Sequence, residues 1–138
     1  MIIFKWDKPI KNKETGAFHF HRLRIFQCSL FGIYLHYIYK ADEDKHQHDH
    51  PWDFWSLVLE GSYAEFIDNR MYSRSFLSLK YNKAEFYHKL ANVLGKNKRC
   101  VTLVFAGKRR RNWGYVTKSG WIDNETYRNL KKEGKLPD

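Results

Sequence analysis

A short histidine-rich segment, residues 46–53, holds the side chains of this sequence that are best suited to chemistry. In an extended strand alternate side chains share one face, so His46, His48 and His50 would point the same way. His48 and His50 would then be close enough to grip one ion. The proline that follows should bend or end the strand, which could turn Asp53 toward the same point. Two histidines and a carboxylate that leave open positions suit non-haem iron or a related divalent ion.

The alternative for this segment is an exposed, histidine-rich loop without a function. The aromatic residues Trp52, Phe54 and Trp55 favour the metal site, because they bring an apolar wall up to the cluster. We expect them to keep bulk water away from a bound ion, and we expect Trp52 and Trp55 to contact a substrate.

Length and composition bound the remaining possibilities. With 138 residues, of which 43% are hydrophobic, the chain can bury a core, and we expect a single domain over residues 1–138. The net charge of +10 makes an anionic partner plausible, such as a phosphorylated substrate, a nucleotide or a nucleic acid. Cys28 and Cys100 lie far apart and suggest neither a disulfide framework nor a CxxC site.

The sequence shows no targeting or membrane-spanning signal. Its first residues lack a basic segment followed by a long apolar one, and no stretch approaches the roughly 18 apolar residues of a transmembrane helix. We therefore expect a cytoplasmic protein without a membrane partner.

Strand-like patterning dominates the chain and predicts an all-β sandwich or barrel. The expected strands are residues 18–26, 30–39, 54–59, 63–67, 70–77, 85–90 and 100–106. Gly61 and Ser62 suit a two-residue hairpin turn. One helix is expected over residues 123–133, with Asp123 as its N-cap and Gly134 after its end.

Two further sequence features resemble the cupin motifs. His48 and His50, followed by Gly61, resemble the first motif, and His88 followed four residues later by Asn92 resembles the end of the second. The match covers roughly residues 46–105. The usual glutamate would fall at Phe54, which makes Asp53 a displaced substitute, and the PxG turn of the second motif is missing.

The resemblance implies an antiparallel double-stranded β-helix, or jelly-roll barrel, with one short C-terminal helix. It implies a divalent metal, iron by default with zinc, manganese or nickel as alternatives, held by His48, His50 and His88. Asp53 would be a further ligand or an acceptor that fixes a histidine tautomer. A homodimer is expected by analogy with the family. Residues 48–54 and 107–121 look, more narrowly, like small cupin-like proteins of phages and bacteria, which gives no substrate.

A basic, aromatic segment, residues 108–115, is the second candidate site. Guanidinium groups suit phosphate and carboxylate oxygens, and aromatic rings can stack on a base or a sugar. If the segment runs on as a strand, one face is shared by Arg109, Arg111, Trp113 and Tyr115, and we expect Arg111, Trp113 and Tyr115 to bind an anionic substrate. A solvated basic turn is the alternative.

Three functions compete at this point. The first is a metal-dependent oxygenase or isomerase acting on a small anion. The second is a metal-free sugar-nucleotide isomerase or epimerase, in which His48 or His88 would be a general base. The third is a non-catalytic module whose basic face binds nucleic acid. A serine or cysteine hydrolase is disfavoured, because no GxSxG motif occurs and both cysteines lie in strand-like segments.

Overall fold

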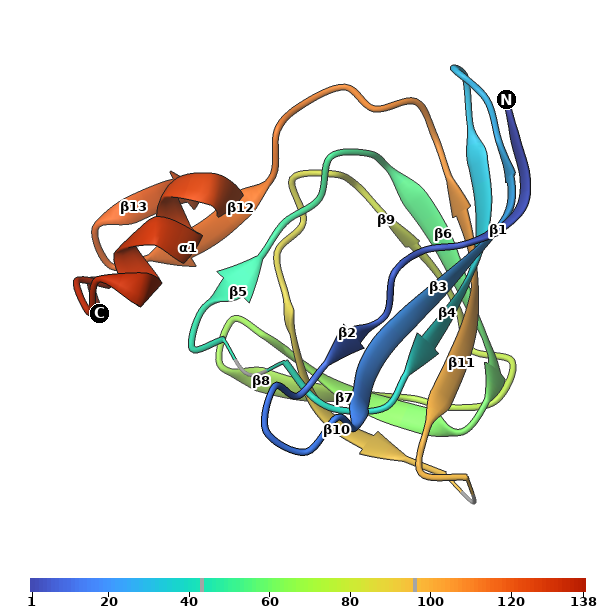
Figure 1. Ribbon diagram of the computed structural model, residues 1–138, viewed down its shortest axis with the longest axis horizontal. Coiled ribbons are helices and arrows are strands. Elements are labelled where there is room, and N and C mark those ends of the chain that lie inside the picture. The colour runs from blue at the N-terminus through green and yellow to red at the C-terminus, as the bar shows by residue number, and fades with distance from the viewer. Residues whose placement is uncertain (43, 96) are drawn as a thin grey trace.

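The computed structural model describes residues 1–42, 44–95 and 97–138, and its strands curve around a barrel (Figure 1). All strand pairs are antiparallel. A single short helix near the C-terminus lies beside the barrel with two strands of its own segment (Figure 1). The expected all-β architecture with one C-terminal helix is therefore confirmed.

The largest sheet has the order β1-β3-β4-β11-β6-β9, and β2 pairs with β3. Its strands are β1 (Ile2–Trp6), β2 (Ile10–Lys11), β3 (Phe18–Gln27), β4 (Gly32–Ile38), β6 (Phe54–Glu60), β9 (Leu79–Asn82) and β11 (Cys100–Ala106). Most of these ranges fall where apolar alternation predicts strands, because one face of each strand points into the barrel.

Two smaller sheets complete the wall. One has the order β10-β7-β8, with β7 (Ser62–Ile67), β8 (Arg70–Arg74) and β10 (Lys89–Leu94). The other has the order β13-β12-β5, with β5 (Gln47–His48), β12 (Gly114–Thr117) and β13 (Gly120–Asp123). An isolated bridge joins His48 to His88, through backbone hydrogen bonds of 2.8 and 3.0 Å. This bridge fixes the two histidine-bearing segments against each other.

The core lies inside the barrel and forms two clusters. The first contains Tyr34, Phe54, Val104 and Ala106, with Trp52 packed against it. The second contains Ile38, Val58, Tyr63 and Cys100. Their neighbours in sequence on β6 and β11, Trp55 and Phe105, point outward and are exposed, as strand alternation requires.

The tight connection between β6 and β7 depends on Gly61. Its φ is +70°, and a Cβ at this position would lie 2.3 Å from the carbonyl oxygen of Arg99. A glycine is the residue that tolerates both the left-handed conformation and the close approach. The two-residue hairpin predicted at Gly61 and Ser62 is wrong, because β6 and β7 do not pair: the chain passes at Gly61 from the largest sheet into the sheet β10-β7-β8.

The helix α1 (Asn124–Lys132) begins where the sequence predicts. The Asp123 side chain accepts a hydrogen bond from the Thr126 backbone N–H, as an N-cap should. Tyr127 is the buried residue of the helix, and its ring stacks on Tyr115 with a centroid distance of 3.7 Å. No helix in the described part of the chain is long and apolar enough to span a membrane.

Two expected strands are wrong in part, and the segment over residues 108–115 runs as a strand only from Gly114. The strand expected over residues 70–77 ends at Arg74. The chain turns at residues 84–85, so the strand expected over residues 85–90 begins only at Lys89. Residues 107–113 form an irregular loop, and β12 starts at Gly114, because the loop is held by its side chains rather than by strand pairing. The face-sharing expected for Arg111, Trp113 and Tyr115 therefore does not apply.

Candidate metal centre

Three histidines converge at one end of the barrel interior. His48 ends β5, His50 follows two residues later, and His88 immediately precedes β10. One ring nitrogen of each can be chosen so that all three lie within 4.8 Å of one another. The ring centroids of His48 and His50 are 5.3 Å apart, and each lies 5.0 Å from that of His88. The structure thus brings together the three histidines that the cupin motifs indicate.

The surroundings keep the imidazoles of His48 and His50 neutral. Burial and, to a smaller extent, the neighbouring His88 together lower the pKa of His48 to about 4. Burial likewise holds the pKa of His50 well below its ordinary value, with His88 and His48 contributing. Neutral imidazole is the form that binds a metal ion, so at pH 7 both rings have a free lone pair.

One ring nitrogen has no hydrogen-bond partner. Nδ1 of His50 is buried, and no described residue donates to it or accepts from it. A buried polar atom without a partner costs roughly 1–3 kcal/mol, so the site has unused binding capacity. A divalent cation bound by the three imidazoles fits this arrangement, because its ligands would be neutral nitrogen atoms.

A buried carboxylate supports His88 from behind. Nδ1 of His88 lies 3.4 Å from Oε1 of Glu65, a side chain that is 1% exposed. This contact leaves Nε2 of His88 for an ion, in the manner of a carboxylate–histidine–metal arrangement. Burial alone would raise the pKa of Glu65, but hydrogen bonds with His88 and Lys80 outweigh it and lower the pKa to about 2.

Asp53 does not join the group, contrary to expectation. Its Oδ1 accepts hydrogen bonds from the backbone N–H of Ala84 at 2.7 Å and from Nη2 of Arg110 at 2.8 Å. With both partners on its carboxylate, Asp53 fixes the turn at Ala84 and the Arg110 side chain instead of joining the histidines. Oδ2 of Asp42 lies 3.6 Å from Nδ1 of His48. Sequence reasoning missed Asp42 and Glu65, because neither lies in a recognisable motif.

Arg111 also differs from expectation. Its Nη1 lies 2.9 Å from Oδ2 of the buried Asp49 and 3.0 Å from the carbonyl oxygen of His50. Asp49 in turn accepts from the Gly114 N–H and from Nε1 of Trp121. The guanidinium of Arg111 is therefore occupied by contacts that fix the histidine segment, and Arg111 does not line the pocket.

The predicted aromatic residues lie partly near the histidines and partly on the outside of the barrel wall. The Trp52 ring lies 6.1 Å from that of His50, and the rings of Trp113 and Tyr115 lie 6.3 and 6.2 Å from that of His48. Trp55 is 48% exposed and packs against Tyr81 on the outside of the barrel. The expectation for Trp55 is wrong, because the residue next to the inward Phe54 must point outward in a strand.

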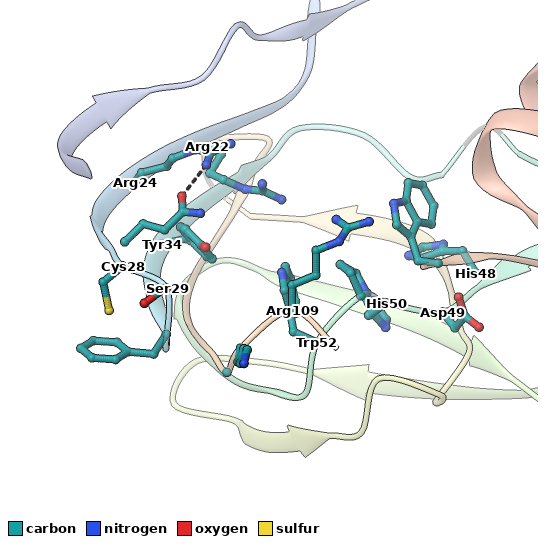
Figure 2. A pocket seen from close by; sticks show the side chains of 16 residues that line it. Arg22, Arg24, Cys28, Ser29, Tyr34, His48, Asp49, His50, Trp52 and Arg109 are labelled. Atoms are coloured by element: carbon teal, nitrogen blue, oxygen red, sulfur yellow. Dashed lines mark hydrogen bonds between the residues drawn. The ribbon is translucent and has the colours of Figure 1, made fainter. Parts of the chain in front are cut away.

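Three neighbouring pockets include His48 in their lining, and two of them also include His50. An inner cavity of about 200 Å³ is lined by all three of them and by Arg22 and Trp52. An outer pocket of about 590 Å³ shares His48, His50, Arg22 and Trp52 with it (Figure 2). The cationic residues of the outer pocket are Arg22, Arg24, Lys108 and Arg109. Lys108 and Arg109 belong to the basic segment that the sequence indicates, whereas sequence reasoning missed Arg22 and Arg24.

Comparisons with known proteins show the fold. No protein-family model matches the chain, and no curated protein matches it in sequence. Among solved structures, the polyketide cyclase RemF from Streptomyces resistomycificus is similar, with a TM-score of 0.62 and 20% identity over 95% of this chain and 93% of that one. A sugar phosphate isomerase of the cupin superfamily from Silicibacter pomeroyi has a TM-score of 0.55 and 17% identity, over 78% of each chain. The iron(II) form of HppE has a TM-score of 0.56 and 9% identity, over 77% of this chain and 60% of that one. The barrel described above is thus a cupin barrel.

Proposed function

We propose that this small cupin-fold protein is a metal-dependent enzyme that acts on a small anionic substrate. The observation that carries the proposal is the meeting of His48, His50 and His88, whose candidate ligand atoms lie within 4.8 Å of one another. The unpartnered Nδ1 of His50 supports it, since a bound cation would satisfy this atom. The cationic lining of the outer pocket supports an anionic substrate.

A bound divalent ion, iron by default and zinc, manganese or nickel as alternatives, would supply Lewis acidity or redox chemistry at positions that three histidines leave open. The residues of the chain do the rest. Trp52 and Phe54 pack around the His50 ring and restrict access of water to it. Glu65 orients His88, while Asp49 and Arg111 hold the segment that carries His48 and His50.

A metal-free isomerase or epimerase of the cupin fold is the alternative enzyme. A neutral histidine can act as a general base, and the lowered pKa of His48 means that it is unprotonated at pH 7. This alternative predicts protein that contains no stoichiometric metal. A nucleic-acid-binding module has less support, because Arg110 and Arg111 of the basic segment are engaged by Asp53, Glu85 and Asp49.

A homodimer is part of the proposal. Exposed apolar side chains gather on the outer face of β6, β9 and β11, where a groove is lined by Trp55, Leu57, Leu79, Leu103 and Phe105. An apolar face of this kind favours association with a second copy over contact with water.

Elemental analysis tests the metal site directly. The protein is purified without a metal-affinity tag, and its metal content is measured for wild type, His50→Ala and His21→Ala. We expect near-stoichiometric metal in the wild type and at least a tenfold loss in His50→Ala. His21 is the matched control, because its Nε2 bonds to the carbonyl oxygen of Asp7 outside the group. Full metal content in His50→Ala would refute His50 as a ligand.

A further inference from the structure

Four cationic side chains line the outer pocket, and they differ in whether they already have partners. Arg24 is paired on both sides: Nε and Nη2 donate to the two Asp7 oxygens at 2.6 and 3.1 Å, and Nη1 donates to Gln27 (Figure 2). Its guanidinium is therefore not available to a ligand.

Arg22 is held in place but not neutralised. Its Nε donates to Nε2 of His36 at 3.1 Å. Its Nη1 lies 3.7 Å from Oδ2 of Asp7, which is a longer contact than a hydrogen bond. The guanidinium lies over the Tyr34 ring, 5.2 Å from the centroid. Burial lowers the pKa of Arg22, yet an arginine stays charged at neutral pH. The counter-charge that Arg22 contacts, Asp7 at 3.7 Å, is shared with Arg24, which binds it more closely.

Arg109 is the complementary case in the loop after β11. Within the described parts of the chain its guanidinium makes no hydrogen bond or ion pair, whereas its neighbours Arg110 and Arg111 are both bound to carboxylates. Figure 2 shows the guanidinium groups of Arg22 and Arg109 extending into the pocket from two different walls. The gap between them is a place for a negatively charged group.

Nearby carboxylates do not neutralise the positive charge around this gap. Asp49 also lines the pocket, but it is 3% exposed and is saturated by Arg111, Trp121 and the Gly114 N–H. Asp7 is shared between Arg24 at 2.6 Å and Arg22 at 3.7 Å. Among the residues that the structure describes, Arg109 and Lys108 have no carboxylate partner, so positive charge remains in excess at the pocket wall.

The remaining lining is aromatic. Trp52 lies between the outer pocket and the inner cavity, and Phe31, Tyr34 and Trp113 complete the pocket wall. Aromatic side chains favour a flat, apolar ligand body, and guanidinium groups favour planar oxyanions.

We propose that Arg22 and Arg109 together clamp the carboxylate or phosphate of a substrate whose ring or other flat apolar body lies against Trp52. Arg22 lines the inner cavity with the three histidines, so the atoms next to the anionic group would face the metal centre. This inference extends the proposed function by naming the substrate class. The anion clamp itself needs no metal, which allows the two proposals to be tested separately.

Calorimetric titration of chelator-treated, metal-free protein tests the clamp at physiological salt. The probes are benzoate, phenyl phosphate, inorganic phosphate and benzyl alcohol. We expect at least one aromatic anion to bind at least tenfold more tightly than inorganic phosphate and benzyl alcohol. The order of benzoate and phenyl phosphate then identifies the anionic group. No binding of either aromatic anion, or equal binding of inorganic phosphate, would overturn the proposal.

Matched arginine variants separate the clamp from general charge. Arg109→Gln should weaken the aromatic anion at least tenfold, whereas Arg70→Gln, an exposed position on β8 outside the pocket, should change it less than twofold. Equal losses in both would reduce the effect to net charge and overturn the clamp. Arg22→Lys keeps the charge but loses the planar guanidinium, and we expect at least a fivefold loss of affinity, with circular dichroism used to show that the variant remains folded.

Metal content and anion binding give distinguishable failures. A wild-type protein that binds the aromatic anions but purifies without metal would remove the metal-dependent function and leave the clamp intact. A protein that holds stoichiometric metal but binds none of the anions would remove the clamp alone.

Discussion

At the scale of single residues, the state of the metal centre depends on carboxylates outside the histidine motif. Glu65 is 1% exposed and touches Lys80 at 2.7 Å, Arg74 at 3.0 Å and His88 at 3.4 Å. A carboxylate buried to this degree is tolerated because its interactions with these cations and the imidazole offset the free-energy cost of desolvating it. The same contacts fix which nitrogen of His88 faces the other two histidines.

Replacing Glu65 with glutamine tests this role. The amide keeps the shape but removes the charge that accepts from His88, so we expect metal affinity to fall about 10- to 100-fold. The unpaired Lys80 and Arg74 should also lower the free energy of unfolding by about 3 kcal/mol. Chelator competition measures the affinity, and urea denaturation measures the stability.

Glu60→Gln is the control for that experiment. Glu60 pairs with Arg99 at 2.6 Å at the far end of β6 and does not contact the histidines. Its replacement should leave metal affinity within a factor of two. An unchanged affinity in Glu65→Gln as well would show that His88 does not depend on this carboxylate.

The sequence identifies the three histidines but not their supports. Spacing and motif position are enough for His48, His50 and His88, because strand geometry and the barrel bring such positions together. Arg111 and Asp53 are misassigned, because a charged side chain next to a site can point into it or bind the backbone beside it. Asp49 and the Ala84 N–H decide that choice, and neither partner is visible in sequence.

At the scale of elements, the C-terminal segment holds the histidine strand in place. β12 pairs with β5, with Tyr115 opposite His48, and α1 packs on β12 (Figure 1). Tyr127 connects the helix to this strand pair. Its ring stacks on Tyr115, and its hydroxyl lies 2.8 Å from Nδ1 of the buried His46.

Two substitutions of Tyr127 separate packing from hydrogen bonding. Tyr127→Ala leaves a cavity and should lower the free energy of unfolding by about 3–5 kcal/mol. Tyr127→Phe keeps the ring but leaves Nδ1 of His46 without its partner, which should cost about 1–2 kcal/mol. Urea denaturation followed by circular dichroism measures both. Equal effects of the two variants would show that the ring contributes nothing.

Elements with regular alternation are predictable, and those set by side-chain contacts are not. The strand expected over residues 100–106 agrees with β11 at both ends, since its buried face is continuous. The late start of β10 follows instead from the turn at Ala84, whose N–H is bound by Asp53. Strand pairing of residues 108–113 is replaced by ion pairs to three carboxylates, which no local pattern shows.

At the scale of the whole molecule, charge and apolar surface are segregated. The net charge of +10 includes an excess of positive charge in the outer pocket. The outer face of β6, β9 and β11 is instead apolar around Trp55, Leu79 and Phe105, which are 48%, 60% and 48% exposed. A positively charged protein repels its copies, so association must occur through a face that carries little charge.

A double variant of this apolar face tests the proposed homodimer. Stable interfaces bury about 800 Å² on each partner, and apolar burial contributes roughly 25 cal/mol per Å², so two lysines at the centre should dissociate the dimer. Light scattering after size exclusion should give twice 16.7 kDa for the wild type and 16.7 kDa for Leu79→Lys/Phe105→Lys. Leu94→Lys is the control, because Leu94 is 62% exposed on β10, away from this face, and its variant should remain dimeric. Retained metal in the double variant would show an intact barrel. The homodimer would be contradicted if the wild-type protein remained monomeric at a protein concentration 100 times that of the calorimetric titration.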